Sequence, residues 1–173
     1  MTETDTYFLQ SSRLGFRCWR SDDLPLAMGL WGDPAVTRLI GGPFSEDQVK
    51  SKLVAEIVSQ TEFRVQYWPM FLLANRQHAG CAGLRPYRAE ERIFELGFHL
   101  KPPYWGYGLA EEAGRAVVDY AFDRLQVKGL FAGHHPANEA SRRVLIKLGF
   151  QFTGEELYPP TGLMHASYLL MRL

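Results

Sequence analysis

The sequence is poor in cysteine, in net charge and in long apolar runs, and each absence excludes a class of protein. It has two cysteines, Cys18 and Cys81. No Cys/His spacing resembles a zinc site, so we expect no metal. Each cysteine lies in an apolar, strand-like run, which predicts reduced thiols in a cytoplasmic protein. Nineteen acidic residues balance nineteen basic ones, which argues against a nucleic-acid partner bound through bulk charge.

Membrane association is also not expected. No apolar run approaches the ~20 residues of a membrane span, and the opening "MTETDTYFLQ" lacks the form of a signal peptide. The composition, with 46% hydrophobic and 22% charged residues, is that of an ordinary globular protein. We find no repeat, low-complexity tract or linker, so the sequence predicts a single domain over residues 1–173 with a full core of its own.

Hydrophobic periodicity in the first third predicts a strand followed by two helices. Residues 13–19 alternate as a first strand, and Asp22 and Asp23 stand where N-cap residues of a short helix belong. Ser45 with Gln48 predicts a capping box at the start of a longer helix. The apolar stripe expected on that helix comprises Val49, Leu53, Val54 and Ile57.

Three strands and then a β-α-β-α unit are expected in the remainder. "YWPMFLLAN" and "AGCAGLRPY" flank a short hairpin connection, and residues 93–100 supply the third strand. A long helix follows Tyr104, a strand begins at Gly129, and "NEASRRVLIKL" is a helix that ends at Gly149. Two strand-like segments close the chain. This order predicts an α/β sandwich with a mixed sheet, in which the strands starting at Ile93 and Gly129 run parallel.

The stretch "YWGYGLAEEAGRAVVDYAF" places two glycines, Gly106 and Gly108, at the entrance of an amphipathic helix. The first N–H groups of a helix lack intrahelical partners, and the macrodipole adds roughly half a positive charge there. Glycines allow a ligand to approach the backbone closely. The pattern is neither the dinucleotide fingerprint nor a P-loop. By itself it indicates either a phosphate site or a structural turn that packs a helix onto a strand.

Two longer segments give this turn a context. "HLKPPYWGYGLAEEA", followed by "NEASRRVLIKLGF", closely resembles the signature segments of the GNAT N-acetyltransferases. "RLGFRCWRSDDLPLAMGLWGDPAV", "HAGCAGL" and "FELGFHLKPPYWG" are similar to the branch of the ribosomal-protein N-alpha-acetyltransferases (RimJ/RimL-like). The resemblance covers almost the whole chain in consistent order. It implies acetyl-CoA as cosubstrate and a mixed, mostly antiparallel twisted sheet, splayed between its fourth and fifth strands, with helices on both faces.

The resemblance places the pyrophosphate of coenzyme A on the glycine-rich turn. The family pattern Arg/Gln-x-x-Gly-x-Gly/Ala is matched by Gly108 and Ala110, whereas Trp105 stands at the Arg/Gln position and removes a charged contact. We therefore expect backbone N–H groups from Tyr107 to Glu111 to bind the pyrophosphate. The coenzyme-binding residues expected in this loop are Trp105, Gly106, Tyr107, Gly108, Leu109, Ala110 and Glu111.

The resemblance also assigns the pantetheine arm and the thiolate. Leu100 stands where the family's strand splays, so its backbone groups are expected to pair with pantetheine, with Phe98 sharing that task. Asn138 is a good helix N-cap and also matches the asparagine that binds pantetheine in similar proteins. Ser141 is the residue expected to meet the departing thiolate, because Leu145 stands where many superfamily members carry a tyrosine. For Ser141 the alternative is a helix-surface serine.

Three basic residues follow on the same helix, and they could reach the 3′-phosphate of the coenzyme. Arg143 is the one we assign to coenzyme binding, and the alternative for Arg142, Arg143 and Lys147 alike is a solvated helix face. No sequence feature requires a covalent acyl-enzyme, since direct transfer needs a neutral amine, a polarised carbonyl and an acceptor for one proton.

Glu95 is the candidate base. It stands on the strand before the loop with Gly97 beside it on the same face, where we expect a substrate to come close. Members of the superfamily often have a carboxylate near this position, acting through water. The alternative is a strand glutamate paired with an arginine. We expect at least one of His134 and His135 to face the cleft, and His99 to be a structural histidine.

The branch resemblance favours the α-amine of a protein N-terminus as the acceptor. Such an amine has a pKa near 7.7–8.0, so about a tenth is neutral at pH 7, and a weak or water-mediated base suffices. A small amine (polyamine or aminoglycoside) and a non-catalytic acyl-CoA-binding regulatory module remain as alternatives. The acceptor groove is expected from residues 31–44 and 158–165. Trp31 and Trp68, expected to be exposed, permit a homodimer without requiring one.

Overall fold

The computed structural model describes residues 7–173, and these build one eight-stranded sheet with the strand order β1-β2-β3-β4-β5-β6-β8-β7. All neighbouring strands are antiparallel except β5 and β6, which are parallel, as predicted. The strands are β1 (Leu9–Gln10), β2 (Leu14–Phe16), β3 (Tyr67–Leu72), β4 (His78–Arg88), β5 (Ile93–Leu100), β6 (Gly129–His134), β7 (Gln151–Tyr158) and β8 (Leu163–Met171).

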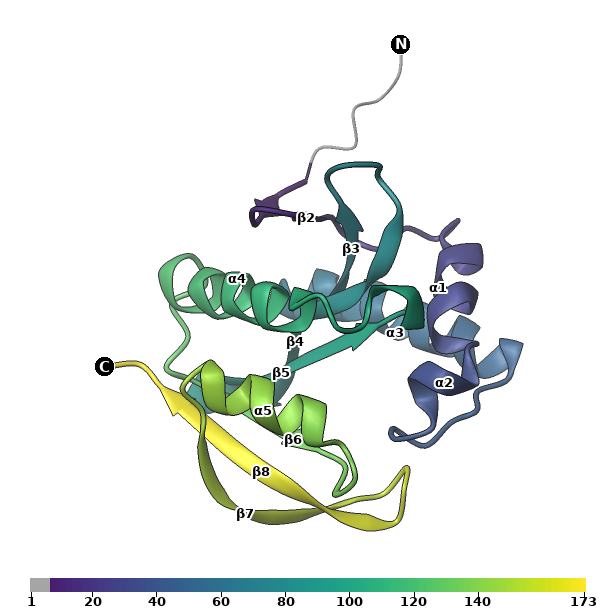
Figure 1. The fold of residues 1–173 in the computed structure, drawn as a ribbon. Helices are drawn as coiled ribbons and strands as arrows, with labels where there is room; N and C mark the ends of the chain where they lie inside the picture. Colours follow the sequence, from purple (N-terminus) through teal and green to yellow (C-terminus); the bar gives the residue numbers. More distant parts are fainter. Residues whose placement is uncertain (1–6) are drawn as a thin grey trace.

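Helices cover both faces of this sheet, so the architecture is the expected α/β sandwich (Figure 1). The α-helices are α1 (Leu24–Trp31), α2 (Pro34–Thr37), α3 (Glu46–Phe63), α4 (Leu109–Asp123) and α5 (Glu139–Lys147). Short 3-10 helices span Ala89–Glu91 and Pro102–Tyr104. No helix among residues 7–173 is both long and apolar enough to cross a bilayer.

Two apolar cores result, one on each face. On one face, α4 and α5 pack against the sheet through residues such as Val117 and Leu145. On the other face, α1 and α3 pack through Trp31 and Leu53 onto Tyr67 and the rest of a smaller core. The sheet thus separates the core under α4 and α5 from the core under α1 and α3.

The predicted boundaries agree with the structure where local chemistry decides them. Ser45 and Gln48 form both bonds of the capping box. Gly149, with φ of +93°, follows the end of α5. The first predicted strand is shorter than expected, and β1 precedes it. Val54 was wrongly placed in the apolar stripe of α3, since it is 59% exposed. Asp23 does occupy the N-cap of α1, but its carboxylate pairs with Arg17 at 2.7 Å.

The prediction of two exposed tryptophans is wrong. Trp31 and Trp68 are 0% and 1% exposed. Trp31 packs against Trp19 with ring centroids 5.2 Å apart, and the Trp68 indole packs edge-on against Tyr120 at 5.6 Å. Both rings are core residues because each has an aromatic partner on the same face of the sheet. They therefore lend no support to a homodimer.

Candidate active site

The ladder between β5 and β6 ends partway along both strands. Its last pair joins Glu95 to Phe131, although β5 continues to Leu100 and β6 to His134. Beyond that pair the strands splay apart. They are the fourth and fifth of the strands predicted from the sequence, since β1 was not among them, so the splay lies where the resemblance implied. The ladder thus stops at the candidate base.

The splay leaves backbone groups of β5 without a neighbouring strand. The N–H of Lys101, just after β5, donates to the carbonyl of Ala79 in β4 at 2.9 Å. Because hydrogen-bonding groups alternate sides along a strand, the odd-numbered residues of β5 face β4 and the even-numbered ones face β6. Past the last ladder pair, the residues facing the gap are Leu96, Phe98 and Leu100. This edge is suited to pairing with an extended ligand.

Trp105 occupies the position where the family pattern has Arg or Gln, and it has a different role. Its Nε1–H donates to the carbonyl of Leu100 at 2.8 Å. The carbonyl of Leu100, one of the backbone groups expected to pair with pantetheine, thus already accepts one hydrogen bond, and the N–H stays the clearer candidate for that pairing. The indole also ties the glycine loop to the end of β5 and so sets the spacing between them.

The loop itself is open toward solvent. Gly106 and Gly108 have φ of +84° and +76°, a conformation that side chains other than glycine rarely adopt. A Cβ at Gly106 would meet nothing within 4 Å. Gly108 is the N-cap of α4, and no hydrogen bond within the described chain occupies the N–H groups of residues 107–111. Free amides at a helix entrance, with space before them, fit a pyrophosphate.

Acidic side chains in the first turn of α4 oppose an anion, and each has a cationic partner. Glu112 pairs with Arg13 at 2.6 Å, and Glu111 pairs with Lys147 at 3.4 Å. Arg13 also donates to the carbonyl of Tyr107 at 2.9 Å. Arg13 thus places a cation beside the loop, in which Trp105 stands at the Arg/Gln position of the family pattern. Sequence reasoning missed it, because nothing local indicates that the start of β2 lies beside α4.

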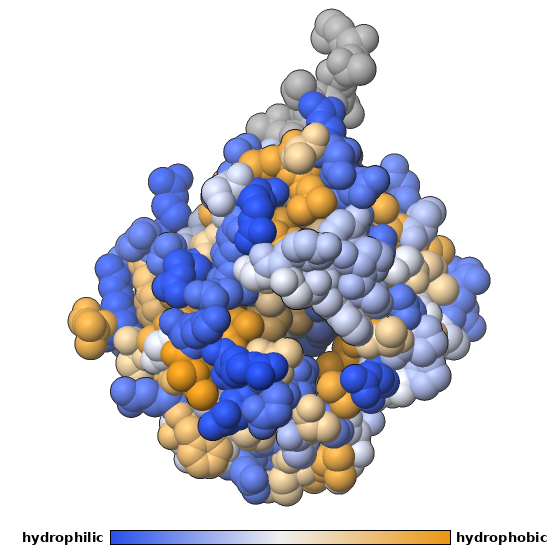
Figure 2. Space-filling model, viewed as in Figure 1, coloured by the Kyte–Doolittle hydropathy of each residue, from blue (hydrophilic) through white to orange (hydrophobic). Residues whose placement is uncertain are grey.

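A cavity of about 240 Å³ opens at the splay and is lined from both faces of the sheet. From the α4/α5 side it is lined by Phe98, Asn138 and Ser141, and from the α1/α3 side by Glu95 and Lys52. In space-filling form the α4/α5 side of the molecule is hollowed near its centre (Figure 2). The cavity therefore connects the two faces through the gap between β5 and β6.

The start of α5 positions two of the predicted residues. Asn138 is the N-cap, and its Oδ1 accepts the N–H of Ser141 at 3.1 Å, so its capping role is confirmed. Its amide NH2 keeps both donors. Leu145, one turn after Ser141, is 1% exposed and packs in the core. Arg143 is exposed and, among the described residues, has no ion pair.

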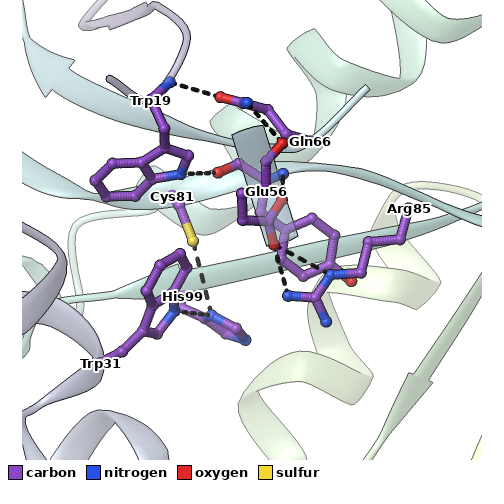
Figure 3. Close-up of polar contacts among 8 residues, drawn as sticks. Trp19, Trp31, Glu56, Gln66, Cys81, Arg85 and His99 are labelled. Carbon is purple, nitrogen blue, oxygen red and sulfur yellow. Dashed lines mark hydrogen bonds and ion pairs between the residues drawn. The ribbon is translucent and has the colours of Figure 1, made fainter. Parts of the chain in front are cut away.

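Glu95 faces the cavity without a bonded partner. No hydrogen bond or ion pair in residues 7–173 holds its carboxylate. Arg85, its neighbour on β4, turns instead to the buried Glu56 of α3 at 2.8 Å (Figure 3). Burial raises the pKa of Glu95 above its ordinary value, the charge of Arg85 opposes this, and Glu156 adds to it. The alternative of an arginine-paired strand glutamate is thus not what the structure shows.

The space above Gly97 is taken by a side chain. A Cβ at Gly97 would collide with the hydroxyl and ring of Tyr67. The glycine thus makes room for the phenol, but Gly97 also lines the cavity beside Glu95, so a close approach of the substrate there stays a prediction. Tyr67 is 3% exposed and lines the cavity, and the guanidinium of Arg85 lies 3.8 Å from its ring centroid.

His99 lines the same cavity but is engaged as a structural residue, as predicted. Its Nδ1 accepts the indole N–H of Trp31 at 3.0 Å (Figure 3). Burial and the charges of Arg85 and Lys52 lower the pKa of His99 to about 3. The sulfur of Cys81 lies 3.7 Å from the same ring nitrogen. Cys18 and Cys81 are both free thiols.

The far wall comes from the segments expected to form the acceptor groove. Leu39 and Ile40 line the cavity from the loop after α2, and Tyr158 and His165 line it from the β7–β8 hairpin. His134 and His135 also line it, which confirms that at least one faces the cleft. Four further residues that line the cavity were not predicted from the sequence: Lys52, Tyr67, Arg85 and Glu156.

The predicted residues thus fall into two groups. Glu95, Phe98, Asn138 and Ser141 line one cavity, whereas Leu100, Arg143 and the loop of residues 105–111 lie outside it. Within residues 7–173, no group of three or more His, Cys, Asp or Glu side chains could hold a metal ion. A splayed strand pair, a cavity through the sheet and free amides at a helix entrance define a site suited to group transfer from an extended anionic carrier.

Comparison with known proteins agrees with that class. The family model described as "Acetyltransferase (GNAT) domain" matches residues 13–151, and the chain belongs to this family. The uncharacterized N-acetyltransferase YoaA of Bacillus subtilis is 28% identical over 148 residues, 84% of each chain. The FsC-acetyl coenzyme A-N(2)-transacetylase of Aspergillus fumigatus is 31% identical over 147 residues, 76% of this chain and 61% of the relative.

Solved structures show the same fold. A crystal structure of RimL, a ribosomal L7/L12 alpha-N-protein acetyltransferase, superposes with a TM-score of 0.80. The superposition covers 94% of this chain and 92% of that one at 15% sequence identity. Together with the N-acetyltransferase relatives, the family identifies this protein as an acetyltransferase that uses acetyl-CoA.

Proposed function

We propose that this protein transfers the acetyl group of acetyl-CoA to the α-amine of a protein N-terminus. The observation that carries the proposal is the cavity at the splay, which brings Glu95 and Ser141 into one space from opposite faces of the sheet. The coenzyme enters from the α4/α5 face, and the acceptor enters from the face covered by α1 and α3. Each reactant then has its own entrance, so both can be bound at once.

The residues of the coenzyme side have separate roles in this proposal. Free amides of residues 107–111 bind the pyrophosphate, and Phe98 and the N–H of Leu100 pair with the pantetheine arm. The amide NH2 of Asn138 donates to the same arm, and Arg143 meets the 3′-phosphate. Residues 107–111 carry no side-chain cation, so their backbone does the binding.

The chemical step needs one proton moved and one anion stabilised. The neutral amine attacks the thioester carbonyl, a C–N bond forms, and the C–S bond breaks to release a thiolate. The hydroxyl of Ser141 donates to that thiolate, and Glu95 takes the amine proton through a water molecule. A raised pKa suits Glu95 to this task, because a more basic carboxylate holds the proton more readily.

The charge of the acceptor side favours a peptide over a polyamine. Two carboxylates, Glu95 and Glu156, line the cavity together with two cations, Lys52 and Arg85. A strongly acidic cleft, suited to polycations, is therefore absent from the described part of the wall. RimL, a ribosomal L7/L12 alpha-N-protein acetyltransferase, has the same fold.

A small-molecule amine is the second candidate. The relative named FsC-acetyl coenzyme A-N(2)-transacetylase, which this chain matches at 31% identity, favours it. The test is incubation with acetyl-CoA and N-terminal peptides, polyamines and aminoglycosides, followed by mass spectrometry. Acetylation of peptide α-amines supports the proposal, and acetylation of the small amines alone refutes it. Binding of acetyl-CoA without transfer to any acceptor would indicate a regulatory module.

A further inference from the structure

Lys52 is a cation in the cavity wall that forms no ion pair within the described chain. It lies on α3, half-buried, and no hydrogen bond or ion pair within residues 7–173 reaches its ammonium. Two aromatic rings lie beside it: Nζ lies 5.0 Å from the ring centroid of Phe44 and 5.6 Å from that of Trp31. Cation–π contacts offset part of the cost of desolvating an ammonium, but they do not neutralise it.

Arg85, the other cation of this wall, differs in that respect. Its guanidinium is paired with the buried carboxylate of Glu56 at 2.8 Å. Glu56 thus pairs with Arg85, and no ion pair joins it to Lys52 within the described chain. Burial and the charge of Arg85 lower the pKa of Lys52, and the charge of Glu56 opposes this only in part. An anion bound beside Lys52 would supply further compensating charge.

The position of Lys52 relative to Glu95 follows from α3. Lys52 and Glu56 are one helical turn apart on the same face, about 6 Å along the axis. Glu56 contacts Arg85, which is the cross-strand partner of Glu95. Lys52 lies one turn from Glu56 on α3, near enough to His99 that its charge helps to lower the pKa of that histidine.

The acceptor side of the cavity therefore presents two groups that no ion pair holds, the carboxylate of Glu95 on β5 and the ammonium of Lys52 on α3. A molecule with an amine for the first group and an acidic group for the second complements both charges. The cavity measures about 240 Å³, so a peptide whose α-amine lies at Glu95 presents only its first residues to Lys52, and we place the acidic group within the first two.

Building on the proposed function, we propose that Lys52 binds a carboxylate of the acceptor and selects N-termini with Asp or Glu among their first two residues. Lys52 is then a specificity-determining residue, and its contact is made equally before and during transfer. Its effect is expected in KM more than in kcat.

The test compares peptides that differ only at position 2, which is Glu, Gln or Lys, with acetylation followed by mass spectrometry. For the wild-type enzyme we expect kcat/KM for the Glu peptide to exceed that for the Gln peptide about tenfold, equivalent to about 1.4 kcal/mol. The Lys peptide should be poorer still. K52M should bring the Glu-to-Gln ratio close to one, whereas K52R, which keeps the charge, should retain most of it.

Lys50→Met is the matched control, because Lys50 lies on the same helix, is exposed and pairs only with Glu46. It should leave the ratio as in the wild type. A wild-type enzyme that acetylates all three peptides equally overturns the proposal, and this holds even if K52M fails to fold. A K52M ratio that stays near tenfold overturns it as well. If no peptide is acetylated although small amines are, the proposed function itself fails.

Discussion

Replacing Glu56 by Gln tests how the fold keeps the candidate base free. Glu56 is 4% exposed; one carboxylate oxygen accepts the N–H of Tyr67 at 2.8 Å and the other accepts the guanidinium of Arg85 at 2.8 Å. Glutamine retains the shape and one acceptor oxygen but removes the charge. The guanidinium of Arg85 is then left without its anion, next to Glu95.

The cost follows from the burial of the pair. Removing one partner of a buried ion pair costs about 3–5 kcal/mol, because the other charge stays desolvated. Here the side chain of Arg85 is 33% exposed and can turn toward Glu95, so we expect E56Q to lower the free energy of unfolding by about 2–4 kcal/mol. The control is E91Q. Its pair with Arg88 has a separation of 4.0 Å and side chains more than half exposed, and removing it should cost less than about 0.5 kcal/mol.

A second effect of E56Q concerns the pH dependence of the reaction. Burial raises the pKa of Glu95 and Arg85 opposes it. A freed Arg85 opposes it more strongly, so the pKa falls. Glu95 acts when deprotonated, so a lower pKa moves the acidic rise of kcat/KM to lower pH. Urea unfolding and pH–rate profiles of wild type, E56Q and E91Q measure both effects. Equal stability of all three proteins, or an acid limb that does not move in E56Q, would refute the reasoning.

Three further predictions concern the site directly. Gly108→Val places a β-branched side chain at φ of +76° on the free amides, so acetyl-CoA binding in calorimetry should be lost; an unchanged affinity would remove the pyrophosphate from the loop. Ser141→Ala should slow turnover severalfold and leave the acetyl-CoA Kd nearly unchanged, and a wild-type rate would exclude Ser141 from thiolate stabilisation. Glu95→Gln should slow acetylation of N-terminal peptides and remove the part of the acidic rise of kcat/KM that the ionisation of Glu95 contributes, leaving the rise set by the α-amine. A pH–rate profile of the same shape as the wild type would argue against Glu95 as the base.

The elements that the sequence predicted are those determined by local patterns. The apolar spacing of α4, the capping box of Ser45 and the glycine after α5 each depend on residues a few positions apart. The parallel pairing of β5 with β6 followed from chain order, since a helix connects them. Asp23 shows the limit, because it stands at an N-cap while its carboxylate is taken by Arg17.

The candidate site divides in the same way. Glu95, Asn138 and Ser141 were predicted because they lie within or beside the signature segments, and the structure brings them to one cavity. Lys52 and Arg13 were not, because their positions depend on how α3 and β2 pack against distant parts of the chain. From the sequence, Gly97 indicated only open space beside Glu95. The Tyr67 ring lies over Gly97 because of the register of β3, β4 and β5, which the sequence does not give.

The most direct test of the account is a crystal structure of the protein with coenzyme A. The central claim is that the amides of residues 107–111 bind the pyrophosphate and that the pantetheine arm enters the gap between β5 and β6. The account predicts phosphate oxygens within about 3 Å of those amide nitrogens and the coenzyme sulfur in the cavity beside Ser141. Coenzyme bound at any other surface, with β5 and β6 unoccupied between Leu96 and Leu100, would contradict it.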